Sequence, residues 1–426
     1  MHSPRILIIS SVDPTTGGGT VAMNFYNALK REGIETDFLT KYPVKGHPEF
    51  LHVFPEKKKM SLLQRWADHR SRQVGRNVPQ QGDHFFDNGP ETESPVSPER
   101  ILKQIKKPYD VVFIVFWHQM LTYYTIFRIW EKLRCQIHLR CPDNQATGGG
   151  CHFNGTCQRL SEGCGFCPGL KNGSQNDFTA ANIRYRKEII REMRPIVYGN
   201  THMQNINRRS FLLRDYDRLE TVYPMVDNDF FRPMDIGSAK KEAGVPEGKD
   251  FVLFFGSSVL DEERKGMKYL MEALRIFSGK LSSAERERVY LLVAGTNASA
   301  IMSGSPFEYR DLGYIPFAQL PVIYNAADAF LCPSIDDAGP SMVNQSLSCG
   351  TPVVSFESGT ALDMVKGHHT GYCAKLRDAD DFAAGIMKIY SEGKTAFTEE
   401  CRGIAIERTT GEAFVKRLLE IIEKYS

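Results

Sequence analysis

The segment 332–356 constrains the fold of this chain more than any other stretch. An apolar run ends at the start of this segment. Pro333 terminates the run, because proline has no N–H group to donate to a neighbouring strand within a sheet. A second apolar run, 352–356, closes the segment. Between the two runs a short helix is predicted, with Ser341 as its N-cap and Gly350 as the residue just past its end. Buried strands joined by a helix predict a parallel sheet.

The predicted helix follows a polar loop that contains Asp336, Asp337 and Gly339-Pro340. Backbone N–H groups at a helix N-terminus form an anion site, so a phosphate here needs no dedicated cation. Gln345 lies about one turn inside the helix. The arrangement suits a sugar nucleotide.

A second strand, loop and helix are predicted around residues 251–274, and the loop contains Arg264, Lys265 and Gly266. Two cations at the start of a helix are disfavoured by the helix dipole when they are only solvated. They make more sense if an anion binds there, so we expect Arg264 and Lys265 to contact an anion.

A third such unit opens the chain, where a buried strand at 5–10 leads through Gly17-Gly18-Gly19 into a helix over 20–31. In this arrangement the backbone approaches a phosphate or substrate closely. The run lacks the dinucleotide spacing Gly-X-Gly-X-X-Gly, so a plain tight turn is the alternative for Gly18 and Gly19.

The segment 332–356 resembles the donor-binding segment of retaining GT-B glycosyltransferases of the family 4 type, the glycosyl transferases group 1. The matching positions are Pro333-Ser334, Asp337, Gly339-Pro340 and Cys349 to Val354. Two positions depart from the pattern, because Asp337 and Gln345 stand where the family has Glu. The Gln can still bond to a ribose but loses the charge-assisted part, on the order of 1 kcal/mol.

The resemblance implies an α/β chain with the GT-B architecture, two doubly wound Rossmann-like parallel-sheet domains facing a central cleft. We expect an acceptor-side domain over 1–224, a nucleotide-sugar domain over 225–410, and a last helix at 411–426 that crosses back to the first domain. The implied reaction moves a hexose from a UDP- or GDP-sugar to a polysaccharide or lipid-linked oligosaccharide, with retention and without a catalytic metal.

The resemblance also assigns roles to individual residues. The proposed catalytic residues are Asp337, Lys265 and Arg264. Donor-binding positions are Gly18, Gly19, Gly313, Tyr314, Ile315, Gly339, Pro340, Ser341 and Gln345. The turn at 313–315 corresponds to the loop that contacts the nucleobase, with a simple strand-to-helix turn as the alternative.

Two further polar residues follow predicted strands on the acceptor side. His118 comes directly after the apolar run 109–117, where it either contacts substrate or is a satisfied structural histidine. Relatives carry His-Asp where this chain has Pro142-Asp143, so Asp143 is the nearest remaining polar group.

Four cysteines, Cys151, Cys157, Cys164 and Cys167, follow in a glycine-rich segment. This density favours a structural zinc site in a cytosolic chain, because disulfides are disfavoured there; a disulfide arrangement is the alternative. The spacing lacks the paired histidines of a zinc module that binds nucleic acid.

Composition narrows the class of protein further. The 426 residues suffice for two domains, and a formal net charge of +2 gives no basic field for nucleic acid. No signal peptide is evident and the longest apolar run, 111–117, is too short to span a bilayer, so we expect a cytoplasmic protein.

The polar segment 47–100 carries Lys57-Lys-Lys59 together with Leu62, Leu63 and Trp66. A basic segment with apolar residues could lie on an anionic membrane at its inner face, where a lipid-linked acceptor would be found. A solvated, mobile insertion is the favoured interpretation.

Gln345, Pro142 and Ser257, which stands where the family has an Arg, make a second function credible: a non-catalytic sensor or scaffold that binds a sugar nucleotide. An epimerase or phosphorylase of the same architecture would need acid/base groups or a pyridoxal-binding Lys, and neither constellation is evident.

Overall fold

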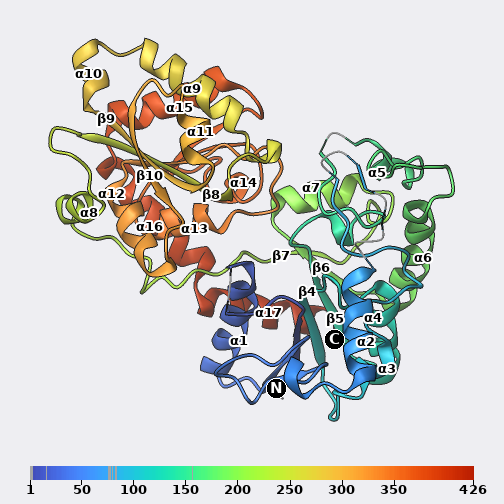
Figure 1. Ribbon diagram of the computed structural model, residues 1–426. Coiled ribbons are helices and arrows are strands. Elements are labelled where there is room, and N and C mark those ends of the chain that lie inside the picture. The colour runs from blue at the N-terminus through green and yellow to red at the C-terminus, as the bar shows by residue number, and fades with distance from the viewer. Residues whose placement is uncertain (1–2, 16, 75–77, 79, 82–83, 156) are drawn as a thin grey trace. The chain divides into compact units, whose positions relative to one another are not determined.

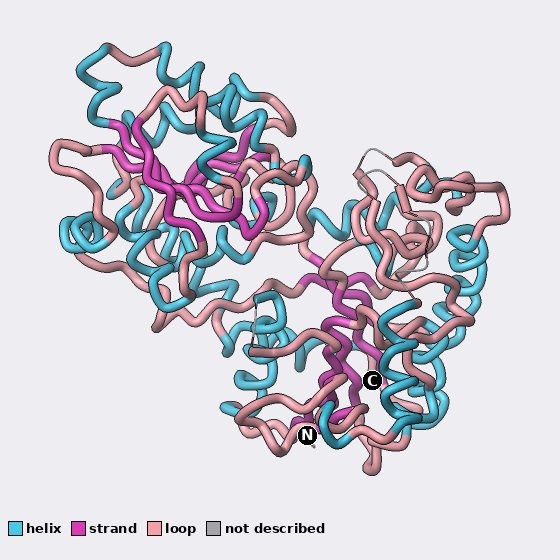
Figure 2. The backbone as a smooth tube through the Cα atoms, viewed as in Figure 1, coloured by secondary structure: helices cyan, strands magenta, loops and turns pink. Residues whose placement is uncertain are grey.

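The computed structural model describes residues 3–15, 17–74, 78, 80–81, 84–155 and 157–426. The chain divides into two compact units, which are described separately (Figure 1). Unit 1 comprises Met1–Tyr223 and Phe414–Ser426, and unit 2 comprises Pro224–Ala413. Each unit contains one sheet with helices packed around it, as the tube in Figure 2 shows.

The sheet of unit 1 has seven strands in the order β3-β2-β1-β4-β5-β6-β7, and neighbouring strands pair in parallel. Its strands are β1 (Ile6–Ser10), β2 (Thr36–Thr40), β3 (Leu51–His52), β4 (Val111–Phe116), β5 (Gln136–Arg140), β6 (Ile196–Gly199) and β7 (Leu219–Thr221). The central strands are consecutive apolar residues because helices cover both faces of a parallel sheet.

The helices of unit 1 connect these strands as crossovers. They are η1 (Gly17–Gly19), α1 (Thr20–Arg31), η2 (Lys57–Lys59), α2 (Leu62–Gln73), α3 (Pro98–Leu102), α4 (Tyr123–Leu133), η3 (Asn144–Ala146), α5 (Arg159–Glu162), α6 (Phe178–Met193) and α7 (Thr201–Arg209). No helix in the described part of the chain is both long and apolar enough to cross a membrane.

The sheet of unit 2 has six parallel strands in the order β10-β9-β8-β11-β12-β13. The strands are β8 (Phe251–Val259), β9 (Val289–Thr296), β10 (Glu308–Gly313), β11 (Ala329–Cys332), β12 (Val353–Phe356) and β13 (Gly371–Ala374). The helices are α8 (Ile236–Glu242), η4 (Glu263–Lys265), α9 (Met267–Gly279), α10 (Ser283–Arg288), α11 (Ala298–Met302), η5 (Phe317–Gln319), α12 (Leu320–Ala326), α13 (Ser341–Ser348), α14 (Ala361–Met364), α15 (Ala379–Glu392) and α16 (Thr395–Thr409). The predicted fold class, two doubly wound parallel-sheet domains, is thereby confirmed.

The last helix, α17 (Gly411–Lys424), packs against unit 1. The ring of Phe414 stacks on Phe25 at a centroid distance of 4.3 Å. On the same helix, Arg417 and Lys424 each donate a hydrogen bond of 2.7 Å to the buried carboxylate of Glu220. An aromatic stack and a buried carboxylate thus fix this segment to the unit that contains the N-terminal strands.

Two expectations are corrected by the structure. The segment following α2 is not a solvated insertion, because its described residues include buried Phe86, Glu91 and Val96. Ser341 is not an N-cap: it is the first residue of α13, and Pro340 occupies the cap position without a side-chain capping bond. Gly350 does follow the helix end with φ of +73°, as predicted for this position.

Candidate functional site

A pocket opens in unit 2 where the direction of strand succession reverses. From β8 the chain proceeds to β9 and β10 on one side, and β11 returns to pair with β8 on the other side. Such a switch point leaves a crevice at the carboxyl ends of the strands, where ligands of doubly wound sheets bind. The pocket is lined there by Gly256, Ser257, Lys265, Asp337 and Ser341, among others.

Lys265 and Asp337 face each other across this pocket. The ammonium Nζ of Lys265 donates to Asp337 Oδ2 at 2.8 Å, and the guanidinium of Arg264 lies 3.6 Å from the same oxygen. Burial raises the pKa of Asp337, but the charge and hydrogen bond of Lys265 outweigh it, so the pKa is held below its ordinary value of 3.8. The pocket is therefore lined by one cation and one ionised carboxylate, and the guanidinium of Arg264 lies close to the same carboxylate.

The backbone explains how the basic pair is held there. Gly266 has φ of +70°, and a Cβ on it would lie 1.9 Å from the carbonyl oxygen of Pro333. The amide of Ile335 donates to the carbonyl of Arg264 at 2.8 Å. These close contacts fasten η4 to the loop after β11, so only glycine fits after Lys265.

The start of α13 borders the pocket through Pro340 and Ser341. Pro340 makes no side-chain capping bond, so the first turn is not covered by its own cap. The amide of Gly339 donates to Asp337 Oδ1 at 3.2 Å, which orients the carboxylate. The helix start is thus placed beside Lys265, as the sequence predicts for an anion site.

The other donor-binding candidates of unit 2 differ in accessibility. Gln345 is buried, and its Oε1 accepts from the Tyr324 hydroxyl at 2.9 Å, so its amide N–H groups are what it could offer a ribose. Tyr314 is 87 % exposed beside Gly313, whose φ is +58° and whose amide donates to Asp311 at 2.8 Å. Ile315 packs partly against the core of the unit.

The glycine run of unit 1 follows β1 at the corresponding switch point, since β2 and β4 lie on opposite sides of β1. A Cβ on Gly19 would lie 1.9 Å from the carbonyl oxygen of Asp13, whereas one on Gly18 would meet only Phe116, at 3.9 Å. Close packing of the turn accounts for Gly19, and Gly18 has room for a side chain.

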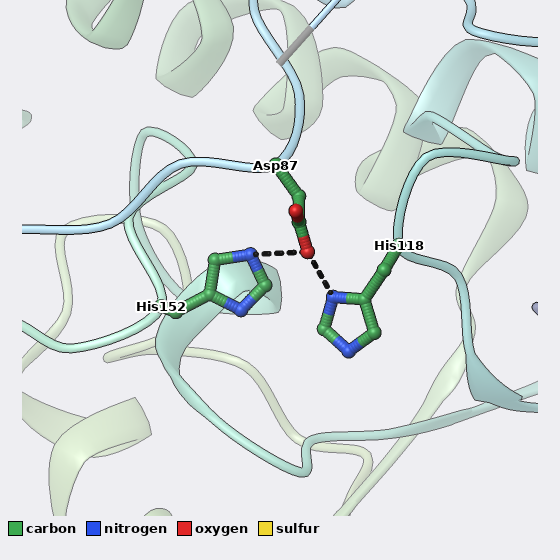
Figure 3. Close-up of side chains that lie close together, drawn as sticks. All are labelled: Asp87, His118 and His152. Carbon is green, nitrogen blue, oxygen red and sulfur yellow. Dashed lines mark ion pairs between the residues drawn. The ribbon is translucent and has the colours of Figure 1, made fainter. Parts of the chain in front are cut away.

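His118 and Asp143 are brought together in unit 1, and they meet two residues that the sequence analysis did not single out as site residues, Asp87 and His152 (Figure 3). His118 Nδ1 lies 3.0 Å from Asp87 Oδ2, and His152 Nε2 lies 3.4 Å from the same oxygen. His152 Nδ1 is hydrogen-bonded to Asp143 Oδ2 at 2.8 Å. The result is a compact cluster of two imidazoles and two carboxylates.

Burial and polar interactions act in opposite directions on the pKa values of this cluster. Burial lowers the pKa of His118, but the bond to Asp87 and the charge of Asp143 outweigh it and raise the pKa above the usual value. Burial raises the pKa of both carboxylates, but the histidines outweigh it, so the pKa of Asp87 and of Asp143 lies below the usual value. The cluster therefore favours ionised carboxylates.

The four clustered cysteines lie together next to this site and line one pocket. All four are free thiols, and no disulfide joins them. The pKa of Cys151 is raised, first by burial and then by the neighbouring thiols of Cys164, Cys167 and Cys157. The backbone of Cys164 adopts φ of +60° beside Gly163 and Gly165, which curls the loop around the thiols.

The fold resembles that of solved glycosyltransferases. Sucrose-phosphate synthase from Thermosynechococcus elongatus superposes with a TM-score of 0.66 and 14 % identity, covering 99 % of each chain. HepE from Anabaena, solved in complex with UDP and glucose, gives a TM-score of 0.62 with 13 % identity over 99 % of this chain and 100 % of that one. The two parallel sheets and their strand order show the GT-B fold.

Sequence comparison identifies a family match within unit 2. Residues 235–405 match the model of the family described as Glycosyl transferases group 1, which supports the group 1 part of the resemblance for this region. The D-inositol 3-phosphate glycosyltransferase of Thermomonospora curvata is 26 % identical over 225 residues, 49 % of this chain and 52 % of that protein. That of Pseudarthrobacter chlorophenolicus is 24 % identical over 210 residues, 46 % and 48 %. The chain spans about half the length of the curated relatives it matches.

Proposed function

We propose that this chain is a retaining glycosyltransferase that moves a hexose from a UDP- or GDP-sugar to a glycan acceptor. The observation that carries the proposal is the pocket at the β8/β11 switch point, where Lys265 and the start of α13 lie together. The match of this region to group 1 glycosyl transferases and the fold shared with a UDP-bound protein support it.

The diphosphate would bind between Lys265, Arg264 and the amides at the start of α13. As the bond between the anomeric carbon and the diphosphate breaks, its electron pair goes to the departing phosphate oxygen, and these groups stabilise the charge. Asp337, held ionised, orients the sugar hydroxyls. The acceptor oxygen attacks from the same face, and its proton passes to the departing phosphate.

This chemistry assigns the donor-side charge stabilisation to the protein's cations and a helix dipole, so we propose that donor cleavage needs no metal ion. Gln345 would donate its amide N–H to a ribose hydroxyl, because its oxygen is bonded to Tyr324. Tyr314, being exposed beside Gly313, would contact the base.

For the acceptor we propose a polysaccharide or a lipid-linked oligosaccharide used by a cytoplasmic enzyme at the inner face of a membrane. The support is the surface of unit 1 around η2 and α2, where Leu62 and Leu63 are 84 % and 78 % exposed and follow the basic run Lys57–Lys59. Apolar residues beside cations suit an anionic bilayer. Vesicle sedimentation with and without anionic lipid tests this, and Leu62→Asp should abolish binding.

We also propose a structural zinc ion at Cys151, Cys157, Cys164 and Cys167. The four free thiols line one pocket, and the loop that carries them is curled by positive-φ residues. Thiolate ligands are the set that a closed structural zinc site uses. The zinc would hold the loop together and take no part in sugar transfer.

Release of nucleoside diphosphate from a panel of UDP- and GDP-sugars tests the activity. The Lys265→Ala variant should lower kcat/KM by about 10²–10³-fold, because it removes a preorganised charge at the leaving group. Lys268→Ala is the matched control, since Lys268 lies in the same region but is 63 % exposed and pairs with Glu263. Tight donor binding without turnover in the wild-type chain would instead support the sugar-nucleotide sensor.

A further inference from the structure

Two backbone pairings that are distant in sequence create the cluster of Figure 3. Phe86 pairs with Cys151 in an antiparallel bridge, and the amide of His152 donates to the carbonyl of Phe85 at 2.9 Å. These pairings bring Asp87 beside His152, and the end of β4 supplies His118. Three separate segments therefore deliver one imidazole or carboxylate each to a single point.

The spacing of these ligand atoms suits a metal ion. One ligand atom from each of Asp87, His118 and His152 lies within 4.8 Å of the other two. The nitrogens of His118 and His152 are 3.0 and 3.4 Å from Asp87 Oδ2. Two ligands at about 2.1 Å from one ion, at octahedral to tetrahedral angles, are about 3.0–3.4 Å apart. Two of the three pairs of ligand atoms therefore stand at ligand spacing, and the two histidine nitrogens lie within 4.8 Å of each other.

The hydrogen bonds of His152 point to the same conclusion. Asp143 accepts from Nδ1 at 2.8 Å, which leaves the lone pair of Nε2 directed at the cluster. His152 is 3 % exposed, and its Nε2 makes no hydrogen bond with the described residues. A buried nitrogen without a hydrogen bond is costly, and a metal ligand whose other nitrogen binds a carboxylate is a common solution.

We propose that Asp87, His118 and His152 bind one divalent transition-metal ion, with Zn²⁺ as the favoured species. Two neutral imidazoles and one carboxylate form a ligand set that Zn²⁺ accepts, and a fourth position remains for water or a substrate oxygen. Asp143 acts as a positioning residue that fixes the tautomer of His152. The ion fastens the segment after α2 to the carboxyl edge of the unit 1 sheet.

This site shares no residue with the donor pocket or with the four cysteines. Its ligands belong to unit 1, whereas Lys265 and Asp337 belong to unit 2. Its ligands are nitrogen and oxygen atoms, so Co²⁺ substitution separates it from the thiolate site: cobalt bound to thiolates shows intense charge-transfer absorption in the near ultraviolet, and cobalt bound only to imidazole and carboxylate does not.

The test begins with the full chain, stripped of metal by a chelator and titrated with Zn²⁺ or Co²⁺. Because a ligand that binds only the folded state raises the melting temperature, one equivalent should raise Tm in a variant with Ser at positions 151, 157, 164 and 167, which lacks the thiolate ligands. The cobalt form should show visible d–d bands without the near-ultraviolet thiolate band. His152→Gln in this background should abolish both signals.

Matched variants keep the proposal falsifiable. His47→Gln replaces a surface histidine of unit 1 that is also paired with a carboxylate, at 3.0 Å, and should retain full metal binding. Asp143→Asn should weaken metal affinity by about 10–100-fold without removing a ligand. If the variant with four Ser or His152→Gln fails to fold, the Asp143→Asn and Asp87→Asn variants in the intact chain give the same comparison through the cobalt bound without thiolates. The proposal is overturned if metal raises Tm only through the thiolate site, or if binding survives in His152→Gln unchanged.

Discussion

The carbonyl oxygen of Pro333 occupies the space that a side chain on Gly266 would need, 1.9 Å from the Cβ position. This contact and the hydrogen bond from the Ile335 amide to the Arg264 carbonyl join the loop that carries Lys265 to the loop that leads to Asp337. These backbone contacts help to hold Lys265 Nζ 2.8 Å from the carboxylate of Asp337.

Replacing Gly266 with Ala should displace the loop and weaken donor binding. The substitution meets a backbone clash as well as an unfavourable φ of +70°, and we expect a loss of stability of about 1–3 kcal/mol. Gly248→Ala is the control, because Gly248 has φ of +81° with nothing within 4 Å of its Cβ position. Tm and the affinity for UDP measure the effect; equal losses in both variants would show that the Pro333 contact is unimportant.

Asp337→Asn should lower kcat by about 10–100-fold while leaving UDP binding intact or tighter, because it loses sugar orientation but frees Lys265 from its ion pair. The pKa of Asp337 lies below 3.8, so the wild-type carboxylate stays ionised as pH rises above that value and is protonated only below it. The kcat profile above pH 5 should therefore contain no ionisation of this group. Asp380→Asn, on the exposed first turn of α15, is the control.

Glu220→Gln should destabilise unit 1 by about 1–3 kcal/mol at neutral pH, since it breaks the bonds to Arg417 and Lys424. Burial raises the pKa of Glu220, but these cations lower it below 4.5. A carboxylate with a lowered folded-state pKa stabilises above its unfolded value and loses this contribution as pH falls through the folded one. The difference between wild type and variant in urea unfolding should thus shrink below pH 4.5, and a constant difference would contradict the mechanism.

Cys164→Ser should remove one zinc equivalent and lower Tm if the four thiols bind metal, because the metal's binding free energy is coupled to folding. Cys135→Ser, which changes a free thiol elsewhere in unit 1, should change neither the zinc content nor Tm by a comparable amount. Elemental analysis of the two purified variants measures the result, and equal zinc in both would rule out the cysteine site.

Local sequence patterns were sufficient for the sheets and for much of the unit 2 pocket. Consecutive apolar residues predicted strands β8 and β11, and Gly350 predicted the end of α13. Both signals are local, because each structure depends on residues only a few positions apart. The N-cap assignment of Ser341 was wrong because Pro340, with extended backbone, takes the cap position itself. That distinction depends on a backbone angle rather than on residue type.

The cluster of Asp87, His118, Asp143 and His152 in unit 1 could not be predicted from local patterns alone. Asp87 lies in a segment without helical or strand periodicity, and its position depends on pairing with residues more than 60 places further along the chain, through Phe86 and Cys151. His152 had one usable signal, since it follows Asp143 across a glycine-rich turn that can bring the two together. The missing information was the non-local pairing.

The division of unit 1 into two stretches has a consequence for biosynthesis. A ribosome completes the helix that carries Phe414 only after all of residues 224–413 have been made. Until then the nascent N-terminal portion exposes the surface of Phe25 and Phe113 that this helix covers in the finished protein. Translation therefore leaves an apolar patch open for the time needed to synthesise unit 2, and a chaperone that shields aromatic surfaces would find its target there.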